Sequence, residues 1–167
     1  MFPTIIVDNF FEDFQKIKKL SQELQYYPPD KDENWGGLRT PSLHTTHPDL
    51  FKEIIIKILM FYYPRHKVSF SNSVLSFYKV RPGDTGKNHF HYDFNTEVAS
   101  VLYISSGDID NGTTILDDFK EKQIIVSNHP NTLIAYDGRK HHGRTAFNVK
   151  KERITLNAFI SGVKAVR

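Results

Sequence analysis

After Pro64 the chain consists of short β-rich runs separated by turn residues, and this sequence pattern constrains the fold more than any other feature. Eight of the runs have the length of a strand and are rich in β-branched or aromatic residues. They are residues 68–73, 74–80, 98–105, 113–116, 123–126, 132–136, 143–148 and 153–160. Turn residues such as Pro-Gly, Asn-Gly and Asp-Gly pairs lie between them. About eight antiparallel strands in one small domain predict a double-stranded β-helix, or jelly-roll, core.

The first third of the chain has a helical pattern instead. Apolar residues recur at helical spacing after the candidate caps Asp8 and Asn9, from Phe10 through Leu24. Residues 30–46 are polar and predict a loop. A second helix is expected from about Pro48 to Tyr63, with Thr46 or His47 as its cap and Pro48 at its first position.

These patterns predict a mainly β protein with N-terminal helices. We expect one domain over 1–167, in which helical support from about 1–66 packs on a jelly-roll core from about 67–161. The residues before Asp8 have the pattern of a strand and lack the features of a signal peptide, so a cytoplasmic location is expected. The oligomeric state is left open.

Composition excludes several classes of function. No apolar stretch reaches the roughly 18–20 residues that span a bilayer, so no membrane partner is expected. The net charge of +3 is carried by scattered basic residues, and this does not favour a nucleic-acid partner. Because the chain has no cysteine, any metal must be held by His, Asp or Glu.

Three such residues stand in a suggestive pattern. His91 and Asp93 are two residues apart, so on a strand they share one face. His142, on a distant strand, would complete the two-His-one-carboxylate set of non-haem Fe(II) oxygenases. The pair alone carries little weight, because His47 and Asp49 repeat it at the start of the second predicted helix, where a structural role explains them.

Arg153 opens the last predicted strand, eleven residues after His142. Arg153 and Thr155 are two residues apart and therefore share one face of the strand. An arginine that faces the interior of a barrel needs an anionic partner. A dicarboxylate co-substrate would supply that partner.

Taken together, these motifs resemble the Fe(II)/2-oxoglutarate-dependent dioxygenase family, in particular its small prolyl-hydroxylase-like branch. The family's motifs occur in the same order here, over roughly residues 74–160. They are Tyr78 to Gly83, His91 to Asp93, Val101-Leu102-Tyr103-Ile104, Asn111-Gly112-Thr113-Thr114, Tyr136 to His142 and Arg153-Ile154-Thr155. The departures are a longer interval between Tyr78 and His91, Asn111 in place of a first Gly, and the His141-His142 doublet.

The resemblance implies a set of roles. His91, Asp93 and His142 would bind the iron. Arg153 would bind the distal carboxylate of 2-oxoglutarate with a hydrogen bond from Tyr103, while Tyr78 would line the pocket and Thr155 is a weaker candidate for the same carboxylate. The cofactors implied are Fe(II), 2-oxoglutarate and O2, with ascorbate as a reductant.

The implied reaction is hydroxylation of an unactivated C–H bond. A peptidyl-proline or another amino-acid residue is the leading substrate, although shared fold does not fix substrate. Free amino acids, other small metabolites and modified nucleobases stay open.

Several alternatives remain at the level of sequence. Spacing favours His142 over His141 as the ligand, and His89 shares a face with His91. A cupin of another catalytic class would use His89, His91, Glu97 and His142. A non-catalytic binding module, which keeps the barrel but has lost the catalytic activity, is a further alternative. Trp35 and Arg39, in the polar segment, could cover a substrate or merely the core.

Overall fold

The computed structural model describes residues 1–30, 36–84, 90–105, 107–116, 123–145 and 149–166. Three helices lie near the N-terminus and most strands follow them. In chain order the elements are β1 (Ile5–Val7), α1 (Phe14–Glu23), β2 (Leu38–Arg39), α2 (Leu43–Thr46), α3 (Pro48–Met60), β3 (Lys67–Ser69), β4 (Asn72–Val80), β5 (Phe90–His91), β6 (Val98–Tyr103), β7 (Thr113–Leu116), β8 (Gln123–Val126), β9 (Leu133–Asp137), β10 (His142–Arg144), β11 (Arg153–Ser161) and β12 (Lys164–Val166).

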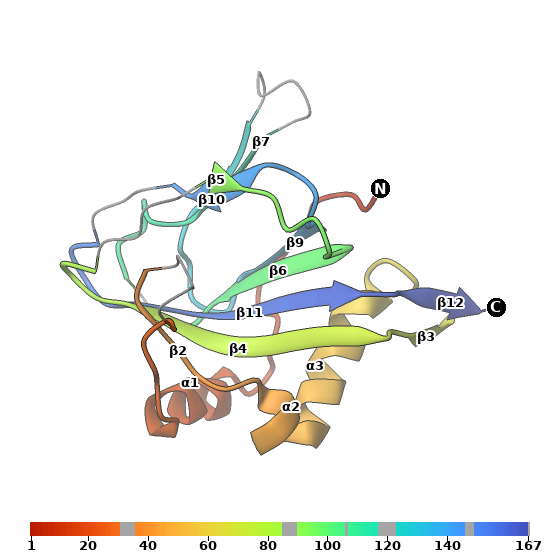
Figure 1. The fold of residues 1–167 in the computed structure, drawn as a ribbon, viewed down its shortest axis with the longest axis horizontal. Helices are drawn as coiled ribbons and strands as arrows, with labels where there is room; N and C mark the ends of the chain where they lie inside the picture. Colours follow the sequence, from red (N-terminus) through yellow and green to blue (C-terminus); the bar gives the residue numbers. More distant parts are fainter. Residues whose placement is uncertain (31–35, 85–89, 106, 117–122, 146–148, 167) are drawn as a thin grey trace.

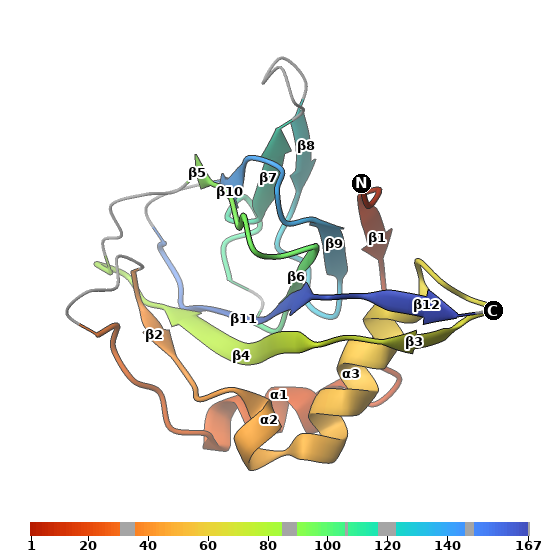
Figure 2. The ribbon, with the colours of Figure 1, turned by 45° about the vertical axis from the view of Figure 1, so that its right-hand side comes forward.

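Two antiparallel sheets face each other. The larger has the strand order β1-β9-β6-β11-β4-β2 and the smaller has the order β5-β10-β7-β8, while β12 pairs with β3 at one end. The helices cover one face of the larger sheet, and the smaller sheet covers the other (Figures 1 and 2). Strands distant in sequence are thus neighbours, and the expected jelly-roll core is confirmed. In the described residues, every helix falls short of the length and hydrophobicity that a membrane span needs.

The alternation of side chains along β6 separates two hydrophobic clusters. Val98 and Leu102 point to the helices and are buried with Ile55 and Leu59 of α3. Residues of the opposite face, such as Tyr103, join the second cluster between the two sheets. The second cluster forms one wall of the barrel interior.

The first helix begins later than the sequence predicted. Its cap is Asp13, whose carboxylate accepts a hydrogen bond from the amide of Lys16 at 3.2 Å, so the assignment of the cap to Asp8 and Asn9 was wrong. Asn131 explains the delay, because its side-chain amide accepts from the N–H and donates to the C=O of Phe11, both at 2.8 Å, so these backbone groups are engaged outside a helix. Phe10 is therefore a core residue that precedes the helix.

The polar segment 30–46 is not only a loop, contrary to the prediction. It contains α2 and also β2, which pairs with β4 at the edge of the larger sheet. Gly37 permits this approach, because its φ of 99° suits glycine and a Cβ there would lie 2.4 Å from the carbonyl oxygen of Lys79. Trp35 lies outside the described residues.

The second predicted helix is α3, and its start matches the sequence. Pro48 holds the first helical position and Asp49 lies in the first turn, with His47 as the cap residue although its side chain makes no cap hydrogen bond. The helix ends at Met60 instead of Tyr63. The strand β12, at the C-terminal end of the described chain, was not predicted.

Candidate metal centre

Two histidines and an aspartate from separate parts of the chain converge at one end of the smaller sheet. His91 of β5 and His142 of β10 are direct partners in the antiparallel register, so their side chains share a face, with ring centroids 4.5 Å apart. Asp93 lies just beyond the end of β5. Its carboxylate oxygens lie 3.6 Å from Nε2 of His91 and 3.3 Å from Nε2 of His142. One donor atom of each residue lies within 4.8 Å of the others.

The hydrogen bonding of these residues fits a divalent cation. Nδ1 of His142 lies 2.8 Å from the carbonyl oxygen of Lys140, and since a carbonyl only accepts, Nδ1 carries the proton. The other ring nitrogen, Nε2, faces Asp93, whose Oδ2 is buried without a hydrogen-bond partner among the described residues. An imidazole nitrogen oriented by a hydrogen bond at its other nitrogen and a buried carboxylate oxygen are together suited to bind a divalent cation.

The turn that follows β9 positions two of the three residues. The carbonyl oxygen of Gly138 accepts the amide of Asp93 at 2.8 Å, and that of Lys140 orients His142. A Cβ at position 138 would lie 2.7 Å from the carbonyl oxygen of Thr96, so glycine is required for this close approach. Asp137 holds the turn, because its buried carboxylate accepts hydrogen bonds from the amide of Phe2 and from Arg139.

We expect Asp137 to make stability depend on pH. Its hydrogen bonds, chiefly from Arg139, outweigh the effect of burial and lower its pKa from 3.8 to about 2. The contribution of the Asp137 carboxylate to the free energy of unfolding should therefore be complete above about pH 4 and be lost as the pH falls towards about 2. Asp137→Asn should lower the free energy of unfolding at pH 7 by about 1.5–3 kcal/mol, and by progressively less below pH 4. Urea unfolding of both proteins across this range tests the expectation, and a difference that does not change with pH would contradict it.

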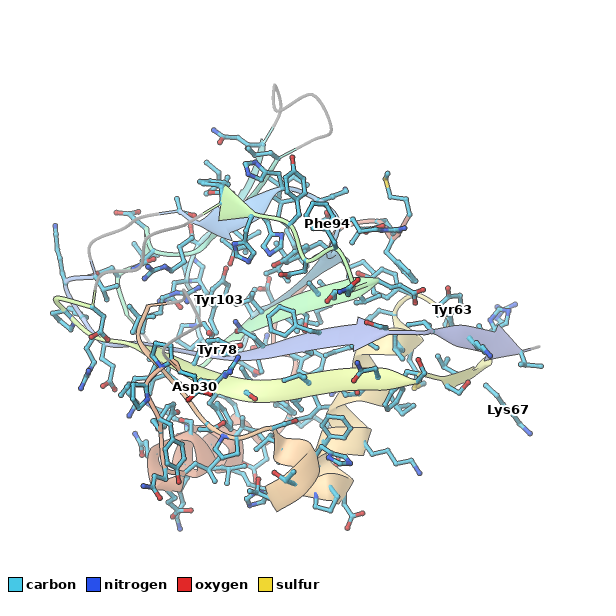
Figure 3. The ribbon with its side chains drawn as sticks, viewed as in Figure 1. Asp30, Tyr63, Lys67, Tyr78, Phe94 and Tyr103 are labelled. Atoms are coloured by element: carbon cyan, nitrogen blue, oxygen red, sulfur yellow. The ribbon has the colours of Figure 1, made fainter. Side chains whose placement is uncertain are left out.

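A second polar group lies deeper between the sheets. Arg153 is 5% exposed, and its Nε donates to the carbonyl oxygen of Asn111 at 2.9 Å. Burial lowers the pKa of Arg153 to about 10, so the side chain stays charged at neutral pH. Its guanidinium carbon lies 5.6 Å from the ring centroid of Tyr103, whose hydroxyl donates to Oγ1 of Thr113 at 2.8 Å. Figure 3 labels Tyr103 together with Tyr78. Burial raises the pKa of Tyr103, which keeps this phenol neutral.

Two further candidates adjoin this group. Thr155 lies opposite Tyr103 on β6 and opposite Tyr78 on β4, so the three side chains share one face of the larger sheet. Oγ1 of Thr155 is buried without a hydrogen-bond partner in the described chain. The hydroxyl of Tyr78 accepts a hydrogen bond from Nη1 of Arg39 at 3.2 Å, so β2 contributes to the rim of this region.

One residue of this interior, Arg144, was not singled out from the sequence. It follows His142 by two positions on β10, which places both side chains on the same face of the strand. Burial lowers the pKa of Arg144, and its Nη1 is buried without a partner among the described residues. The sequence did contain a signal for Arg144. A charged residue two positions after a candidate metal ligand lies on the same face of the strand as that ligand.

The two histidines of the doublet have different surroundings. His142, the first residue of β10, is buried and faces Asp93, whereas the ring of His141, just before β10, stacks on that of Tyr92 with centroids 4.7 Å apart. Tyr92 stacks in turn on Phe94, which is 76% exposed. The ring of His141 thus packs against these aromatic side chains and does not join the three converging ones.

We expect this difference to appear in metal binding. His142→Ala should abolish the binding of Fe(II), and His141→Ala should leave the affinity of the protein for Fe(II) within about threefold. The reason is that, of these two histidines, His142 is the one that offers a nitrogen to the cluster. Anaerobic titration with Fe(II) measures both. The reverse ranking of the two variants would show that the doublet has been assigned wrongly.

The cupin alternative is not favoured. Glu97, which that ligand set requires, accepts a hydrogen bond from the amide of Val163 at 2.8 Å and does not belong to the metal-binding group found in the described residues. His89, the other residue specific to that set, lies outside the described residues.

No family model and no curated protein matches the sequence. The fold, however, is shared with many solved structures. An oxidoreductase of the 2OG-Fe(II) oxygenase family from Burkholderia pseudomallei has a TM-score of 0.73 at 11% identity, over 95% of this chain and 84% of that one. The viral collagen prolyl hydroxylase of Paramecium bursaria Chlorella virus-1, solved with 2OG, has a TM-score of 0.61 at 16% identity, over 98% and 96%.

A third structure is a prolyl hydroxylase from Trichoplax adhaerens in complex with a peptide fragment of hypoxia inducible factor. Its TM-score is 0.68 at 12% identity, over 95% of this chain and 83% of that one. At such identities the likeness establishes the fold. The three proteins described here are, by name, a 2OG-Fe(II) oxygenase and two prolyl hydroxylases, the classes that the sequence motifs resemble.

Proposed function

We propose that this protein is an Fe(II)- and 2-oxoglutarate-dependent dioxygenase that hydroxylates an unactivated C–H bond, with residues 1–167 forming one oxygenase domain. The observation that carries the proposal is the convergence of His91, Asp93 and His142 in the barrel that also buries a charged Arg153. A metal site alone would suit many enzymes. A buried guanidinium in the same interior adds a place for the second carboxylate of a dicarboxylate co-substrate.

In this proposal each residue has a distinct task. His91, Asp93 and His142 hold the iron, which with 2-oxoglutarate and O2 supplies the oxidising power for hydroxylation, giving succinate and carbon dioxide. With three protein ligands, the remaining coordination positions would be available to the co-substrate and O2. The side chain of His91 is half exposed, so the proposed centre lies near the protein surface. Ascorbate serves as reductant in the assay.

The residues around Arg153 prepare the pocket for an anion. The ring of Tyr103 lies against the guanidinium, and its neutral phenol, which donates to Thr113, adds no opposing charge. Thr155, two residues from Arg153 on β11, shares its strand face and has a buried hydroxyl that makes no hydrogen bond in the described residues. Tyr78, held by Arg39, closes the side of the pocket formed by β4. Because these groups are fixed by strands, the pocket needs little reorganisation to bind its ligand.

For the substrate, a peptide is the leading candidate, with a prolyl or another amino-acid residue as the target. The Trichoplax prolyl hydroxylase binds its peptide on the same fold, and this supports a peptide here. Small molecules remain an alternative.

The test is turnover of 2-oxoglutarate. Purified protein with Fe(II), ascorbate and O2 should convert 2-oxoglutarate to succinate slowly by itself and faster with the right substrate. Peptide and metabolite pools should then be searched by mass spectrometry for products heavier by one oxygen. Failure to bind Fe(II) and 2-oxoglutarate together would refute the proposal.

A further inference from the structure

Arg144 is connected to Arg153 by a row of side chains across the barrel interior. In the register of β10 and β7, Arg144 lies directly opposite Thr113. Oγ1 of Thr113 accepts the hydroxyl of Tyr103, and the Tyr103 ring lies against the guanidinium of Arg153. The two arginines therefore approach the same space from opposite sheets.

Their charges are balanced only in part by the described acidic residues. The charge of Arg144 acts on Arg153, and Asp84 is the acidic residue whose charge acts on Arg144. However, the carboxylate of Asp84 already accepts hydrogen bonds from the amide and the guanidinium of Arg81. Nη1 of Arg144 is buried without a partner in the described chain. Two like charges brought together away from water are costly unless an anion joins them.

We infer that Arg144 is a second anchor for the distal carboxylate of 2-oxoglutarate and shares this carboxylate with Arg153. The inference rests on the proposed function and adds a specificity-determining residue to it. A carboxylate has lone pairs enough for two guanidinium groups, and each guanidinium donates in a planar fork. The pocket thus discriminates dicarboxylate 2-oxo acids from monocarboxylate ones more strongly than one arginine would.

The experiment measures binding in the absence of turnover. Fe(II)-loaded protein is titrated anaerobically with 2-oxoglutarate and, separately, with 2-oxopentanoate, which has the same carbon chain without the distal carboxylate. Arg144→Met should weaken binding of 2-oxoglutarate by about tenfold or more. Its affinity for 2-oxopentanoate should stay within about twofold of the wild type, because the group that Arg144 contacts is missing from that ligand.

Arg65→Met is the matched control. Arg65 is exposed between α3 and β3, away from Arg144 and Asp84, so neither ligand should bind differently. The ligand-free Arg144→Met protein should unfold at no lower temperature than the wild type, since a repelling charge has been removed. Arg144→Lys keeps the charge without the planar fork, so it too should weaken binding of 2-oxoglutarate and leave 2-oxopentanoate unaffected, which keeps the test decisive if the Met variant folds poorly.

The outcomes separate this inference from the function on which it rests. A wild-type protein that binds no 2-oxoglutarate overturns the proposed function. A wild-type protein that binds it, with Arg144→Met equally tight, overturns only the role of Arg144. Equal losses for both ligands would also overturn that role, because they would place the effect away from the distal carboxylate.

Discussion

Asp93→Ala is expected to abolish Fe(II) binding and, with it, the conversion of 2-oxoglutarate to succinate. Loss of a residue that merely supports a metal ligand costs roughly 10–100-fold in metal affinity. Removal of a ligand should therefore cost more than about a hundredfold. His91→Ala and His142→Ala should have the same result, since each offers one donor atom to the cluster. Anaerobic Fe(II) titration and succinate formation measure the two effects.

The stability of the metal-free Asp93→Ala protein distinguishes a metal ligand from a structural residue, because only loss of a structural residue should destabilise the fold. Its Oδ2 is buried and makes no hydrogen bond in the described chain, so the metal-free protein should lose little stability in Asp93→Ala. The matched controls are His47→Ala and Asp49→Ala, the second His-x-Asp pair, which lies at the start of α3. Unchanged Fe(II) affinity in Asp93→Ala would contradict the assignment of the metal centre.

The strands could be predicted best where β-branched residues are concentrated in a short run. Residues 113–116 and 123–126 were expected as strands and form β7 and β8 with those bounds. The limits of α1 could not be predicted, because Phe10 continues the helical pattern while Asn131, far along the chain, engages the backbone of Phe11 before the helix begins. β2 was missed for a similar reason, since its pairing depends on the close approach of Gly37 to β4.

The candidate site was predictable as far as residue spacing carries information. His91, Asp93 and His142 were chosen from their spacing and from the family resemblance, and the structure brings their donor atoms together. Period-two alternation also marks Arg144, but it does not show which charges are left without a partner. That property depends on the register of β10 with β7 and on the distribution of acidic groups, which only the folded chain reveals.

Arg153→Ala gives the second large effect that we expect, and it tests the co-substrate and not the metal. A charge-assisted pair in a desolvated barrel should contribute about 2–5 kcal/mol, so the affinity for 2-oxoglutarate should fall by roughly thirtyfold or more. Arg153→Lys should recover little of it, because an ammonium group cannot reproduce the bidentate fork. The affinity for Fe(II) should hardly change, since Arg153 offers no ligand atom to the metal-binding group.

A structural loss must be separated from a loss of ligand contact in this variant. Arg153 donates to the carbonyl oxygen of Asn111, so Arg153→Ala can also disturb the chain before β7. Titration with 2-oxopentanoate resolves the two effects: disturbance of the pocket weakens both ligands, whereas loss of the carboxylate contact weakens only 2-oxoglutarate. Unchanged affinity for 2-oxoglutarate with Fe(II) still bound would remove the reason for a dicarboxylate co-substrate. The same triad would then support a metal enzyme of another class, since the buried charge of Arg153 is what distinguishes the two.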